Sequence, residues 1–153
     1  MTRGLAAILS LLIGSCAAPP DVRGDAAILP GTAVSKLLDQ CSRDIPAAGE
    51  ATWRPEWQDV RKLEAALPAA VEASPERRGL VVARLPIDWK RQYVGIVRNG
   101  ERFIYGNFYP VRSGVAEDRL AEPFVVCDGG PAYFGVEYDL KAGRFSHLAF
   151  NGP

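Results

Sequence analysis

Three acidic side chains near the C-terminal end could do chemistry together. On an extended strand, alternate residues face the same side, so Glu137 and Asp139 would share a face, with Asp128 at a neighbouring turn. Two carboxylates are the minimal machinery of a glycosidase, in which one acts as acid and the other as base or nucleophile. The spacing supports a carboxylate-dependent hydrolase as one hypothesis, although carboxylates on a hairpin are usually solvated.

The chain contains a single histidine, His147. A zinc site needs several converging nitrogen or sulfur ligands, so this residue does not predict one. Ser146 and His147 are adjacent, so on a strand they point to opposite faces, and no Gly-x-Ser-x-Gly elbow surrounds Ser146 or Ser113. The sequence also lacks a P-loop and a dinucleotide-binding fingerprint. We therefore expect no catalytic triad, no metal and no cofactor.

The first sixteen residues have the pattern of an export signal. Arg3 is followed by an apolar run from Leu5 to Ile13, broken only by Ser10, and small residues follow the run. A membrane-spanning helix needs roughly 20 apolar residues, and this run is shorter. The pattern predicts a signal peptide over residues 1–15.

The run closes on Ile13-Gly14-Ser15-Cys16, which resembles the lipobox of bacterial lipoproteins. The resemblance implies that Cys16 is acylated and becomes the mature N-terminus. In that family, Asp after the cysteine retains the protein in the inner membrane. Ala17 stands here, which implies the periplasmic face of the outer membrane. The alternative is ordinary cleavage near Ala17-Ala18, which would release a soluble periplasmic or secreted protein.

With Cys16 assigned to lipid, Cys41 and Cys127 remain. Two cysteines in an oxidising compartment most simply form one disulfide, and no Cys-x-x-Cys motif suggests a reactive pair. The loop between them is long, so the bond would stabilise the fold by roughly 4–5 kcal/mol in the chain-entropy model.

The charge and the aromatic content of the chain indicate which kinds of partner it could bind. Lys and Arg total 18, as do Asp and Glu, so the chain lacks the basic excess expected of a nucleic-acid binder. Tyr, Trp and Arg, the residues that dominate protein interfaces, are frequent around the predicted strands. The candidate binding surface consists of Tyr93, Tyr105, Tyr109, Arg112, Asp128 and Tyr133.

Two helices are expected before the strands. Residues 16–31 contain three prolines and little periodicity, and we interpret them as the attachment cysteine and a tether. Val34, Leu37, Leu38 and Cys41 have helical spacing, which would turn Cys41 toward the core. A second helix begins near Pro55, and Pro68 predicts a kink or break in it. Its apolar stripe is Trp57, Val60, Leu63, Leu67 and Val71.

From residue 92 the apolar period changes to two. Residues 92–98 and 101–109 flank Asn99-Gly100, the strongest short hairpin signal, and a two-residue loop pairs Ile96 with Phe103. Its two faces both carry aromatic residues, so the face not covered by helices needs a partner, a covering loop or exposure. Three further strands are predicted at Phe124–Cys127, Tyr133–Tyr138 and Phe145–Phe150. Leu80–Leu85 could be strand or helix.

These elements predict an α+β domain over residues 32–153, with N-terminal helices packed on an antiparallel meander of four to five strands. In a simple meander, the Asn99-Gly100 turn and residues 128–130 would share one end of the sheet, and the 139–143 turn would lie at the other. The layout is similar to cystatin-type folds, and the middle and end of the chain resemble small proteobacterial periplasmic proteins. Neither resemblance assigns an activity.

Three functions remain open. We favour a non-catalytic, lipid-anchored periplasmic binding module whose partner is a protein, either an envelope assembly component or a hydrolase that it inhibits. The second is a carrier of a small ligand or cell-wall fragment in a cleft between sheet and helices. The third is an envelope hydrolase that uses Asp128, Glu137, Asp139 or His147.

Overall fold

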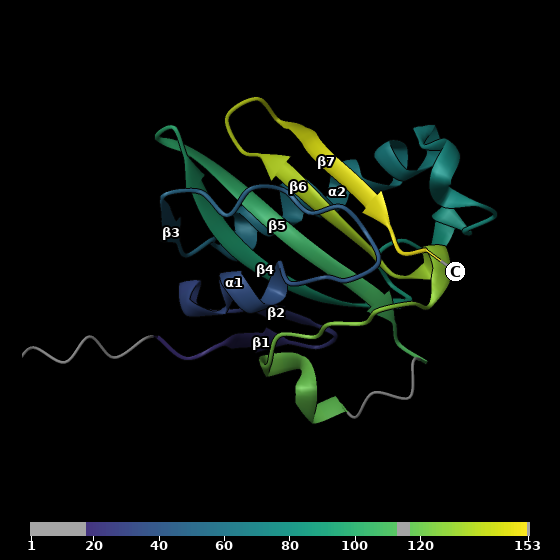
Figure 1. Ribbon diagram of the computed structural model, residues 1–153, viewed down its shortest axis with the longest axis horizontal. Helices are drawn as coiled ribbons and strands as arrows, with labels where there is room; N and C mark the ends of the chain where they lie inside the picture. Colours follow the sequence, from purple (N-terminus) through teal and green to yellow (C-terminus); the bar gives the residue numbers. More distant parts are fainter. Residues whose placement is uncertain (1–17, 113–116, 153) are drawn as a thin grey trace, which may run out of the picture.

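The computed structural model describes residues 18–112 and 117–152, which form one sheet with a long helix on one face (Figure 1). Within these residues the sheet has seven strands in the order β1-β2-β4-β5-β6-β7, and β3 also pairs with β4. Only β2 and β4 are parallel. The strands are β1 Asp21–Arg23, β2 Ala26–Ile28, β3 Ala51–Trp53, β4 Trp89–Arg98, β5 Glu101–Pro110, β6 Phe134–Asp139 and β7 Arg144–Phe150; the helices are α1 Val34–Leu37 and α2 Trp57–Ala73. The predicted combination of helices with a mostly antiparallel sheet is confirmed, but the sheet is mixed and has more strands than the four to five predicted. The expected N-terminal position of the helices is wrong, because β1 and β2 precede them.

The β4–β5 hairpin forms as predicted. Asn99 and Gly100 both have positive φ, 52° and 73°, which is the conformation that a two-residue hairpin turn of this type requires. Ile96 pairs with Phe103, so the predicted register is confirmed. Each strand has ten residues, and this long hairpin is the centre of the sheet.

Helix α2 covers the face of the sheet that carries Tyr93, Phe108 and Phe134, and lies behind the strands in Figure 1. Four residues of its predicted stripe, Val60, Leu63, Leu67 and Val71, are 0 % exposed. Trp57, at the start of the helix, is only partly buried. The predicted break at Pro68 does not occur, because buried apolar contacts on both sides of the proline hold one continuous helix.

The second face of the sheet is covered by irregular segments, which was one of the three possibilities left open. Helix α1 has only four residues, so the predicted first helix stops short of Cys41, which is exposed. The physical reason lies in Gln40, whose amide nitrogen donates to the Leu37 carbonyl at 2.9 Å and satisfies the end of the helix. Leu37 and Leu38 are buried against the sheet as their spacing predicted.

The interpretation of residues 18–31 as a tether is wrong. They contain the β1–β2 hairpin and the short 3₁₀ turn that follows it, and β2 pairs in parallel with the centre of β4. Ala26 to Leu29 are all at most 3 % exposed. This apolar run is too short to show a period, but it is bounded by Gly24-Asp25 and Pro30, which is typical of a buried strand.

The predicted strand at Phe124–Cys127 is also wrong, and the segment is irregular. Its backbone N–H and carbonyl groups form hydrogen bonds with side chains instead of with a neighbouring strand. The Phe124 N–H donates to Gln92 Oε1 at 2.9 Å, and the Phe124 carbonyl accepts from Asn107 Nδ2 at 2.9 Å. Because this strand is missing, the 139–143 turn lies beside the Asn99-Gly100 turn, with the Leu140 N–H donating to the Arg102 carbonyl at 3.2 Å. The expected placement of the turns is corrected accordingly.

Leu80–Leu85 forms neither strand nor α-helix, but contains a 3₁₀ turn at Val82–Arg84. The remaining 3₁₀ turns are Gly31–Ala33, Pro75–Arg77, Glu117–Ala121 and Gly130–Ala132. A search of the described residues finds no helix with the length and apolar character needed to cross a membrane. The predicted leader, Cys16 and Ser113 lie outside the described residues. All the strands above, both apolar cores and the disulfide lie within residues 18–152.

Candidate functional site

The three carboxylates proposed for hydrolysis do not converge. Glu137 is 1 % exposed, forms an ion pair with Arg98, and accepts a hydrogen bond from Ser146 Oγ at 2.7 Å. Asp139 is the last residue of β6, and its Oδ1 accepts a hydrogen bond from the Lys141 N–H at 2.9 Å, so this carboxylate stabilises the turn that follows the strand. Asp128 is exposed at the opposite end of the sheet. A substrate could not reach Glu137, so the geometry argues against the two-carboxylate mechanism.

His147 lies on β7, and its Nε2 is 3.0 Å from the Asp44 carbonyl. This contact links the edge of the sheet to the segment that covers its second face. Among the residues that the structure describes, no group of three His, Cys, Asp or Glu side chains is placed to hold a metal ion.

Most of the predicted aromatic surface is inside the protein. Tyr93 and Tyr105 are 0 % exposed and Tyr109 is 1 % exposed, so these three cannot contact a partner and their assignment is corrected. The prediction failed because Tyr favours both interfaces and sheet interiors. Tyr133 is half-buried, and Arg112 and Asp128 are exposed.

The interface between the sheet and α2, where a carrier would need a cleft, is filled by aromatic rings. Phe108 stacks on Phe134 with ring centroids 4.7 Å apart, and Tyr93 meets Phe108 edge-on at 5.9 Å. The Tyr93 hydroxyl donates to Glu64 on α2 at 2.7 Å. Burial, with Glu64 adding to it, raises the pKa of Tyr93 well above its usual value.

Tyr109 provides a pH-dependent test of this interior. Burial, reinforced by the charge of Asp25, raises the pKa of Tyr109 to about 12, and its hydroxyl has no hydrogen-bond partner. Since the folded pKa exceeds the unfolded value of about 10, the stabilising effect is complete below pH 10 and disappears as the pH rises toward 12. We expect the free energy of unfolding of wild type to fall relative to that of Tyr109→Phe by about 1 kcal/mol between pH 9 and 11.

Urea unfolding of both proteins at pH 7, 9 and 11 tests this expectation. At pH 7 the two should be nearly equal, because phenylalanine leaves no buried partner unpaired. Parallel curves at all three pH values would contradict the assignment.

A polar network fills the second face of the sheet around the buried Arg43 guanidinium. Nη1 donates to Asn151 Oδ1 at 2.9 Å, while Nη2 donates to the Tyr105 hydroxyl at 3.1 Å and to Asn107 Oδ1 at 2.5 Å. Gly135 leaves the required space, because a Cβ there would lie 2.5 Å from the Tyr105 hydroxyl. Arg43 makes no ion pair within the described part of the chain, so neutral oxygens alone hold its charge.

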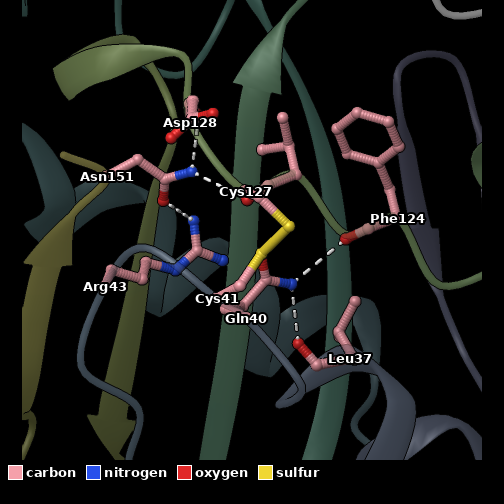
Figure 2. Close-up of a disulfide and its surroundings, with 9 residues drawn as sticks. Leu37, Gln40, Cys41, Arg43, Phe124, Cys127, Asp128 and Asn151 are labelled. Atoms are coloured by element: carbon pink, nitrogen blue, oxygen red, sulfur yellow. Dashed lines mark hydrogen bonds between the residues drawn. A yellow bond between two sulfur atoms is a disulfide. The ribbon is translucent and has the colours of Figure 1, made fainter. Parts of the chain in front are cut away.

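The predicted disulfide between Cys41 and Cys127 is confirmed, and it joins the two irregular segments over this network (Figure 2). Side chains on either side reinforce the junction. Asn151 Nδ2 donates to the carbonyls of Val126 at 3.1 Å and Asp128 at 2.9 Å, and Gln40 Nε2 donates to the Phe124 carbonyl at 3.2 Å. Together these contacts fix the C-terminal end of β7 against the covering segments.

Strand β7 forms one edge of the sheet, and its outer side is open. The backbone N–H of Asn151 donates to the Tyr133 carbonyl at 2.8 Å, so Tyr133 and Asn151 are a hydrogen-bonded pair of the β6–β7 ladder. Opposed residues alternate between bonded and non-bonded pairs, so the backbone groups of Leu148 and Phe150 point away from β6. No other strand of the described residues pairs with β7. Gly152 is the next residue after Leu148 and Phe150 whose N–H points away from β6, and this N–H donates to the Ser42 carbonyl at 2.9 Å.

A hollow runs beside this open edge, and we call it the β7 groove. One part has a volume of about 430 Å³ and lies between Ser42–Asp44 on one side and Glu76 on the other. An adjoining part of about 190 Å³ is lined by Arg78 as well. Both parts share Glu76, Phe150 and Gly152, so charged side chains from the two covering layers flank the outward backbone of β7.

No motif in the sequence points directly to Ser42–Asp44, Glu76 or Arg78, since these residues come from irregular segments that are far apart in the chain. The predicted topology did point indirectly to β7, because the last strand of a meander of consecutive hairpins forms an edge of the sheet. Comparison of the chain with protein-family models, with curated proteins and with solved structures finds no match.

Proposed function

We propose that this protein is a non-catalytic, lipid-anchored binding module of the bacterial periplasm that holds an extended segment of a partner protein along β7. The partner adds a strand to the sheet, so main-chain hydrogen bonds supply affinity and the β7 groove supplies selectivity. An envelope assembly component or an inhibited hydrolase could each present such a segment.

The observation that carries this proposal is the open outer side of β7. Edge strands are usually kept short or are blocked by proline, lysine or a covering loop. β1 and β3 follow this rule with three residues each, whereas β7 has seven and contains no proline or lysine. The Gly152–Ser42 hydrogen bond shows that main chain already docks at the end of this edge.

Two features support the location. The Ile13-Gly14-Ser15-Cys16 sequence resembles a lipobox, and the Cys41–Cys127 bond belongs to a class of cross-link that persists in oxidising compartments. Mass spectrometry of the mature protein tests the anchor separately. We expect an acylated N-terminal Cys16 and a loss of membrane association in Cys16→Ser.

Leu148→Pro should abolish partner binding, whereas Leu148→Ala should retain it. Both variants lose the partly buried leucine side chain, but only proline removes the outward N–H and places a ring against an incoming strand. Proline at an edge position with its N–H directed to solvent is compatible with a sheet, so both variants should fold.

The measurement is quantitative capture of proteins from crosslinked cell envelopes by the two variants and wild type, each carrying Cys16→Ser. Circular dichroism and urea unfolding confirm that the baits are equally folded. A partner retained by wild type and Leu148→Ala but lost from Leu148→Pro supports strand addition. The same proteins on all three baits would exclude β7 as the binding site.

A further inference from the structure

A second hollow, which we call the α2 groove, lies where β1 and the segment after β3 meet the start of α2. Its volume is about 550 Å³. Its charged and aromatic lining consists of Asp21, Arg23, Arg54, Glu56, Trp57 and Arg61. Three of these six residues are arginines and two are carboxylates, so the lining carries one more positive than negative charge.

The three arginine side chains differ in the partners that their guanidinium groups already bind. Arg23 lies 3.6 Å from Asp21 and stacks on the Trp57 ring, 4.9 Å from its centroid. Arg54 donates to a backbone carbonyl and forms no ion pair, and Arg61 has no side-chain partner within the described residues. Two exposed guanidinium groups are therefore free to bind an anion, and the guanidinium fork matches the oxygens of a phosphate.

The groove is close to the N-terminus of the mature chain. Arg54 Nη2 donates to the carbonyl of Pro19 at 2.9 Å, and only Ala17 and Ala18 separate Pro19 from Cys16. Three residues span at most about 10 Å, which is comparable to the Debye length of about 8 Å at physiological salt. With Cys16 acylated, the groove would lie within electrostatic range of the lipid headgroups.

We propose that the α2 groove binds the phosphate of an anionic phospholipid headgroup at the surface of the membrane that holds the chain. This inference rests on the lipid anchor of the proposed function. Arg54 and Arg61 contact the phosphate, Arg23 adds charge at the rim, and Trp57 supplies an aromatic body suited to the headgroup layer.

Headgroup binding would orient the module. β1 and β7 are the first and last strands in the order of the sheet, so they form its two opposite edges. Residues of β1 line the α2 groove and residues of β7 line the β7 groove; Figure 1 shows these two strands far apart. The α2 groove and the β7 groove thus lie at opposite edges of the sheet, so a membrane-bound α2 groove presents the β7 groove to the periplasm.

Vesicle binding by residues 17–153 without the leader tests the inference independently of the anchor. Wild type should bind vesicles that contain phosphatidylglycerol and should not bind phosphatidylcholine vesicles. Each lost arginine should weaken binding about fivefold, so Arg54→Gln/Arg61→Gln should bind about 25-fold more weakly. Arg112→Gln/Arg144→Gln makes the same charge change at exposed sites outside the groove and should bind like wild type.

Three results would overturn the proposal: no binding to phosphatidylglycerol vesicles, an equal loss in both double variants, or saturable binding of soluble glycerophosphate with no preference for vesicles. The third would assign the groove to a free phosphate ligand. Because the protein used here lacks Cys16, a failure of acylation in cells would leave these outcomes unchanged and would refute only the anchor.

Discussion

Replacing Cys41 and Cys127 with serine is expected to lower the free energy of unfolding by about 4 to 5 kcal/mol. The bond closes a loop with a sequence separation of 86 residues, and the chain-entropy model assigns roughly that effect to a loop of this length. Both cysteines are exposed, so serine at these positions introduces no buried polar group. The loss therefore reports the cross-link and not a packing defect.

Urea unfolding with and without a reducing agent separates the bond from the substitutions. Reductant should lower the stability of wild type to that of the double variant and should leave the variant unchanged. Hydrogen exchange should increase most in residues 38–46 and 120–128, because these segments lack a strand ladder of their own. A loss below about 1 kcal/mol would show that the side-chain hydrogen bonds alone hold the covering segments.

Arg43→Met is expected to lower the free energy of unfolding by about 3 to 5 kcal/mol. Methionine keeps the apolar stem but removes the donors to Asn151, Tyr105 and Asn107, which remain buried. A buried polar group left without a partner costs about 1 to 3 kcal/mol, and here three groups lose theirs together.

A double-mutant cycle identifies the cause of this loss. Tyr105→Phe in the Arg43→Met background removes one unpaired hydroxyl, so the double variant should be less destabilised than the sum of the two single variants. Arg43→Lys keeps the charge but lacks the planar fork, so an intermediate loss is expected. Strict additivity of Arg43→Met and Tyr105→Phe would show that the guanidinium and the hydroxyl do not cooperate.

The two proposed sites make different demands on the fold. The β7 groove depends on the covering segments that Arg43 and the disulfide fix in place, since Ser42–Asp44 form one of its walls. The α2 groove depends on β1 and the start of α2, which lie in other segments than the two that the disulfide joins. Cys41→Ser/Cys127→Ser should therefore weaken partner binding before it weakens vesicle binding.

Local chemistry was sufficient for the central hairpin and for α2. Asn99-Gly100 specifies its turn through backbone conformation alone, and the alternating residues on either side set the register. The stripe of α2 specified which side is buried, although propensity wrongly suggested a break at Pro68. Buried contacts on both sides of that proline outweighed its local cost.

Local patterns were insufficient wherever side chains replace a backbone partner. The apolar run Phe124–Cys127 is typical of a strand. Its backbone is instead bound by Gln92 and Asn107 from the sheet and by Gln40 from the segment after α1. The same logic explains the aromatic residues. Tyr105 and Tyr109 have the composition of an interface, but the covering segments bury them against the second face of the sheet.

The sequence by itself determined the cysteine pairing, the hairpin register and the apolar face of α2, because each depends on residue type or on periodicity along a short stretch. Only the tertiary structure decided that β2 pairs in parallel with β4, that the second face is closed by irregular chain, and that β7 remains an open edge. These features arise from hydrogen bonds and packing between residues far apart in the sequence. The residues that flank a segment in the chain do not determine which distant segment it pairs with.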